Sequence, residues 1–76
     1  MDWLAFMTLV FGEHDLSFAN HRADEDRARV MVAEARGTGS TDADIVLQAE
    51  AFLRSKGATE EHIAVEIGKL KEYLAQ

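Results

Sequence analysis

Apolar residues recur at helical spacing through most of the chain, and their pattern divides it into four segments. The first segment is apolar on nearly every side, begins after Asp2 and ends at Gly12. Each of the last two segments follows a threonine and carries one apolar stripe. Stripes that repeat every three or four residues are typical of amphipathic helices with one buried face. The sequence therefore predicts helices at about residues 2–11, 21–36, 42–56 and 60–75.

The second of these segments has the weakest pattern. Its apolar residues recur at helical spacing, but residues 29–32, Arg-Val-Met-Val, are also compatible with a short strand. Alanine, arginine, glutamate and methionine dominate the segment, and all four favour helix. We expect a helix over residues 21–36, with the strand at 29–32 as the alternative.

Capping residues and glycines set the expected ends of the last two helices. Thr41 and Asp44 have the spacing of a capping box, and Gly57 is placed to end the third helix. Residues 37–40, Gly-Thr-Gly-Ser, form the clearest break, which is either a hinge or a turn. The prediction is a single all-α domain over residues 1–76. It has three to four helices, and the last two form a C-terminal antiparallel helical hairpin.

Composition narrows the class of protein. The chain has 76 residues, no cysteine, no proline and a net charge of −6, which excludes a disulfide scaffold or a thiolate metal site. A free-standing nucleic-acid binder normally carries the opposite charge, and Glu60 with Glu61 at the start of the last helix would repel phosphates. We therefore expect no direct nucleic-acid binding. A domain this small often relies on a second chain, so a protein partner or a homodimer is expected.

The apolar run at residues 1–11 is the place to look for a targeting or membrane segment. Its only charge is Asp2, whereas a secretory signal begins with positive residues. The run is also shorter than the roughly 20 residues that span a bilayer. We expect a cytoplasmic protein that does not bind membranes.

Histidines and carboxylates gather between the first and second helices. His14, His21 and Asp24 are ligand types that suit a divalent first-row metal, which makes a small metal-dependent enzyme one hypothesis. A polar loop that leads into the acidic first turn of a helix explains the same residues. The serines lie outside any nucleophile motif, and the glycine-rich break has no phosphate-binding lysine. The sequence therefore predicts no catalytic residues, no metal and no cofactor.

Four polar residues share one face of the last helix. They are His62, Glu66, Lys69 and Tyr73, spaced at i, i+4, i+7 and i+11. A solvated helix face has this pattern, and we expect one here. If the face has a function, docking of a partner is favoured, because tyrosine is enriched at interfaces.

The function favoured by the sequence is a non-catalytic protein–protein interaction, as a small regulator, adaptor or inhibitor. A helix that is apolar all round needs more than one neighbour to enclose it, and a second chain is the expected neighbour. Large aromatic side chains dominate interface energetics. Burial in the protein's own core explains the same side chains equally well. The predicted contact residues are Trp3, Phe6, Leu9, Val10 and Phe11.

The acidic balance supports an alternative from another class. A compact acidic chain can occupy the basic groove of a nucleic-acid-binding protein, acting as an inhibitor or nucleic-acid mimic. Both halves of the chain carry seven acids and four bases, which argues against a focused acidic face. Binding that weakens steeply with salt would favour this hypothesis. Its candidate residues are Asp15, Asp24, Glu25 and Asp26.

Overall fold

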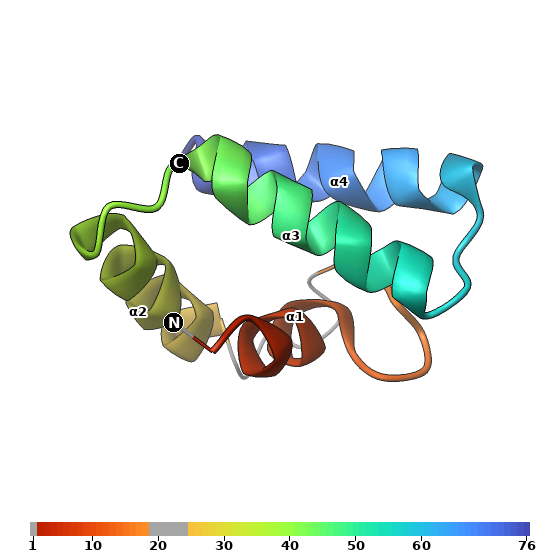
Figure 1. Cartoon of the computed structure of the whole chain (residues 1–76), viewed down its shortest axis with the longest axis horizontal. Helices are drawn as coiled ribbons and strands as arrows, with labels where there is room; N and C mark the ends of the chain where they lie inside the picture. The colour runs from red at the N-terminus through yellow and green to blue at the C-terminus, as the bar shows by residue number, and fades with distance from the viewer. Residues whose placement is uncertain (1, 19–24) are drawn as a thin grey trace.

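The computed structural model describes residues 2–18 and 25–76, and within them the chain forms four helices and no strand (Figure 1). The predicted all-α fold class is therefore confirmed, and residues 29–32 are helical rather than extended. The predicted start of the second helix, at residues 21–24, lies outside the described residues. The helices are α1 (Trp3–Phe11), α2 (Glu25–Gly37), α3 (Asp42–Ser55) and α4 (Glu60–Leu74).

Side chains cap the helices at the positions that the sequence indicates. Asp2 Oδ1 accepts a hydrogen bond from the Ala5 N–H at 3.1 Å and so caps α1. Thr41 and Asp44 form the predicted capping box, each side chain accepting the other's backbone N–H at 3.1 and 2.9 Å respectively. These bonds satisfy donors that the first helical turn leaves unpaired.

The break at residues 37–40 is a hydrogen-bonded turn. Gly39 has a positive φ of 97°, a conformation in which glycine avoids the strain of a side chain. The N–H of Ser40 donates to the Ala35 carbonyl and that of Gly39 to Arg36, at 3.0 and 3.1 Å. This pair of bonds is the Schellman motif, and the same pattern with Gly57 at φ 84° ends α3.

A single apolar core joins all four helices. At its centre, the ring of Phe11 lies 5.8 Å from Phe18 and 6.2 Å from Phe52, measured between centroids. Aromatic pairs at these distances add to the energy of burial. The core comprises Phe6, Met7, Val10, Phe11, Phe18, Ala28, Val32, Ala35, Ile45, Ala49, Phe52, Leu53, Ile63, Ile67, Leu70 and Leu74.

Helices α3 and α4 lie side by side, and α1 packs against both α2 and α3 (Figure 1). Arg36, in the last turn of α2, donates to the Leu74 carbonyl at 2.8 Å and so links α2 to the end of α4. Among the helices of the described residues, none combines the length and apolarity needed to cross a bilayer.

The sequence led us to expect that a second chain encloses α1, but much of this helix is already covered within one chain. Phe6 and Phe11 are 0% exposed within one chain. The apolar sides of α1 are covered by α2, by α3 and by the connector of residues 12–18, which carries Phe18 over the end of the helix. Much of the apolar surface of α1 is thus buried within one chain, while Leu4 and Ala5 stay exposed.

Candidate protein-binding groove

The five predicted contact residues do not form one surface. Phe6, Val10 and Phe11 are buried in the core, so their side chains have no surface to offer a partner. Trp3 and Leu9 are partly buried and pack at the edge of the core. Of the five predicted residues, only Trp3 and Leu9 therefore have side chains that reach the surface.

Leu4 is an exposed apolar residue of α1 that is not among the predicted contact residues. Its side chain is 65% exposed, which makes it one of the most exposed large apolar residues of the described chain. The sequence gives no signal that singles out Leu4, because a helix that is apolar all round does not show which of its sides faces solvent.

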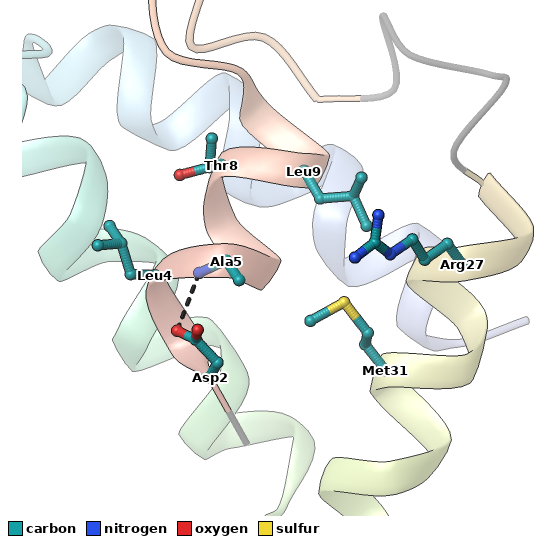
Figure 2. A pocket seen from close by; sticks show the side chains of 7 residues that line it. All are labelled: Asp2, Leu4, Ala5, Thr8, Leu9, Arg27 and Met31. Carbon is teal, nitrogen blue, oxygen red and sulfur yellow. Dashed lines mark hydrogen bonds between the residues drawn. The ribbon is translucent and has the colours of Figure 1, made fainter.

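Helices α1 and α2 border a groove of about 350 Å³ (Figure 2). Leu4, Ala5 and Leu9 form its α1 side, and the thioether of Met31 reaches into it from α2. Methionine is flexible and polarisable, so it adapts to apolar side chains of different shapes. The groove is thus a concave, mainly apolar surface bordered by an exposed leucine.

Three polar side chains also line this groove. The Asp2 carboxylate is engaged in the cap of α1, as the dashed line in Figure 2 shows. Thr8 offers a hydroxyl group, and the Arg27 guanidinium extends from α2 toward Leu9. Arg27 makes no ion pair with any residue that the structure describes, and its side chain is exposed. The groove therefore combines apolar walls with one cation that is available to a ligand.

The structure describes only part of the acidic set proposed for nucleic-acid mimicry. Asp15 is exposed in the connector and Asp26 is exposed in α2. Asp24 lies outside the described residues, and Glu25 begins α2. Other carboxylates are paired with an arginine or lysine within the domain, which reduces the net negative charge that they present outward. These are Asp42, Glu50, Glu60 and Glu66.

The histidines do not assemble a metal site in the part of the chain that the structure describes. His14 is exposed in the connector, and His21 and Asp24 lie outside the described residues. Within residues 2–18 and 25–76 there is no group of three or more His, Cys, Asp or Glu side chains placed to hold a metal ion.

The polar face of α4 is covered by the connector at His62 and Glu66, whereas Lys69 on the same face stays exposed as predicted. His62 Nε2 lies 2.8 Å from the Leu16 carbonyl oxygen, and Glu66 Oε2 accepts the Phe18 N–H at 2.6 Å. Lys69 Nζ donates to the other oxygen of Glu66 at 3.0 Å. Leu16 has a positive φ of 52°, a left-handed conformation that non-glycine residues seldom adopt. These contacts fix the connector on α4, so the face has a structural role.

Two ion pairs outside the groove shift the pKa values of their charged groups. The hydrogen bond from Arg54 lowers the pKa of Glu60 below its ordinary value, and Glu60 in turn raises the pKa of Arg54. Asp42 likewise raises the pKa of Arg36 through a hydrogen bond. Each pair joins neighbouring helices across a turn, which marks these shifts as structural.

Comparison of the chain with protein-family models, with curated proteins and with solved structures found no match.

Proposed function

We propose that this domain is a non-catalytic protein–protein interaction module that binds its partner in the α1–α2 groove. The observation that carries the proposal is the groove itself, a cavity of about 350 Å³ with an apolar wall and an exposed leucine beside it. Burial of a partner's apolar side chain there removes the leucine surface from water, which is the main driving force of association. The lack of cysteine is compatible with a reducing, cytoplasmic setting.

The chemistry of the groove supports a partner segment of a particular kind. Leu9 and Met31 favour an apolar anchor, and Arg27 favours a carboxylate beside it. An amphipathic helix that carries one acidic residue next to its apolar stripe meets both requirements. Binding of this kind is mainly apolar, so it tolerates salt better than binding by an acidic mimic.

A capture experiment with variants of the groove tests this proposal. The tagged protein is incubated with lysate of its source organism and washed at low and at high salt, and bound proteins are quantified by mass spectrometry. We expect a specific partner that survives the high-salt wash and is lost when Leu4→Asp and Met31→Asp are introduced. The variant Val65→Asp is the matched control, because Val65 is 55% exposed on α4 outside the groove.

The outcomes separate the two classes of function. A partner retained equally by the groove variant and the Val65→Asp control would contradict the proposed site. A partner released by salt from all forms alike would favour the acidic-mimic hypothesis. Direct titration of the captured partner with Arg27→Ala then measures the contribution of the cation, which we expect to lie at about 1–3 kcal/mol if it bonds a carboxylate.

A further inference from the structure

A second apolar groove, distinct from the α1–α2 groove, lies between the start of α3 and the end of α4. Its volume is about 500 Å³, and Ala43, Val46 and Leu74 are among the apolar residues that line it. Leu47 stands at its side with 64% of its surface exposed. An exposed leucine next to an apolar recess presents a projection and a cavity on the same surface.

Gly68 extends this surface along α4. It lies three residues before Lys71 and seven before Ala75, which both line the groove, so the three share one helix face. A Cβ atom added at Gly68 would meet no heavy atom within 4 Å. Glycine in a helix interior is unfavourable, and nothing inside the domain requires it here. Because glycine has no side chain, it permits another molecule to approach the helix backbone closely.

The charges beside the groove favour a second copy of this chain as the molecule that approaches α4. Asp42 and Lys71 line it together, so the surface carries one anion and one cation. The Asp42 side chain remains 51% exposed although it bonds to Arg36, and a carboxylate has lone pairs for a further donor. Two copies of such a surface can oppose unlike charges and place an apolar projection in an apolar recess, which is the self-complementarity that a two-fold interface requires.

We propose that two copies of this chain associate through the α3–α4 groove, with Leu47 of each copy packing into the groove of the other. Lys71 of one copy then faces Asp42 of its partner, and the contact is repeated by symmetry. Helix α4 of the second copy approaches the open backbone at Gly68. This interface is separate from the α1–α2 groove, so the dimer leaves that site free for a different protein.

Sedimentation equilibrium of the full chain over about a hundredfold range of concentration tests the association directly. We expect a concentration-dependent dimer that becomes at least about tenfold weaker in Leu47→Glu. Val30→Glu and Val65→Glu place the same charge on exposed apolar positions that line neither groove, and both should dimerise as the unmodified chain does. Circular dichroism checks that each variant is folded.

A charge exchange tests the symmetry of the contact. Lys71→Glu alone places two carboxylates together in the homodimer, and Asp42→Lys alone places two ammonium groups together. Mixing these two variants restores opposite charges at both copies of the contact. We expect each variant to be monomeric at concentrations where the mixture forms a heterodimer.

Substitution of Gly68 separates association from helix stability. Gly68→Gln should raise the thermal midpoint of the monomer, since glutamine favours helix and has open space at this position. The same substitution should weaken dimerisation, because its side chain occupies the approach to the backbone. An unmodified chain that stays monomeric over the whole concentration range would overturn the proposal. A Leu47→Glu dimer as strong as that of the unmodified chain would overturn it as well.

Discussion

Glu66 is 3% exposed, and both oxygens of its carboxylate are hydrogen-bonded. One oxygen accepts a hydrogen bond from the backbone N–H of Phe18, and the other accepts one from the ammonium group of Lys69. A buried charge is tolerated when it is paired and hydrogen-bonded, and both conditions are met here. Glu66 therefore holds the connector on α4, and its role is structural.

Replacing Glu66 with alanine should destabilise the domain by about 1–3 kcal/mol, because the buried Phe18 N–H loses its acceptor. Glu66→Gln keeps an acceptor oxygen, so we expect it to cost less. Urea unfolding followed by circular dichroism measures both changes. Glu72→Ala is the control, since Glu72 lies exposed on the same helix. Equal losses for the Glu66→Ala and Glu72→Ala variants would contradict this role.

The sequence could not predict this role for Glu66. Helical spacing correctly places it on one face with His62, but spacing describes only neighbours along the same helix. The Phe18 N–H is 48 residues away in the chain, and a single sequence carries no signal for a bond of that range. A solvated polar face and a face covered by backbone have the same local pattern.

At the scale of the elements, the helices follow from local rules. Caps, apolar stripes and glycines act within a few residues, so the limits of α1, α3 and α4 agree with the prediction to within about one residue. Which side of α1 stays exposed does not follow from such rules. Because α1 is apolar all round, only the packing of α2, α3 and the connector makes Leu4 the exposed residue and Phe6 the buried one.

The link between α3 and α4 should make stability depend on pH. Arg54 donates to Glu60 at 2.8 and 2.9 Å and lowers its pKa from the ordinary 4.5. The ionised carboxylate therefore stabilises the fold above pH 4.5, and this contribution is lost as the pH falls through the lowered pKa. Glu60→Gln should lower the thermal midpoint slightly at neutral pH, because both groups are exposed to solvent.

Thermal unfolding at several pH values checks this prediction against Glu61→Gln. Glu61 is the exposed neighbour of Glu60 in the first turn of α4. Both substitutions remove a charge from the positive end of the helix dipole, so their difference reports the bond to Arg54. That difference should vanish in acid. A difference that persists at the lowest pH would contradict an ionic origin.

At the scale of the whole molecule, one small core supports every helix. A chain of 76 residues at about 0.05–0.15 kcal/mol per residue has a total stability of roughly 4–11 kcal/mol. A single core aromatic therefore contributes a large part of the total. Phe11 illustrates this, because its ring contacts both the connector and α3.

Phe11→Ala should cost about 3–5 kcal/mol and leave much of the protein unfolded at room temperature. Leu4→Ala removes a large apolar side chain from the same helix, but Leu4 is exposed, so its cost should stay within about 0.5 kcal/mol. Chemical unfolding of both variants measures the two values. A small loss for Phe11→Ala would contradict the burial of α1 within one chain.

The bond between Phe18 and Glu66 also bears on how the protein is made. A ribosome adds about 5–20 residues per second, so the 48 residues that separate the bonded pair take about 2–10 s to synthesise. During that interval the most apolar helix of the chain has been made, while the helix that anchors its connector has not. The nascent protein therefore leaves the end of α1 that the connector covers exposed to chaperones and to aggregation until α4 emerges.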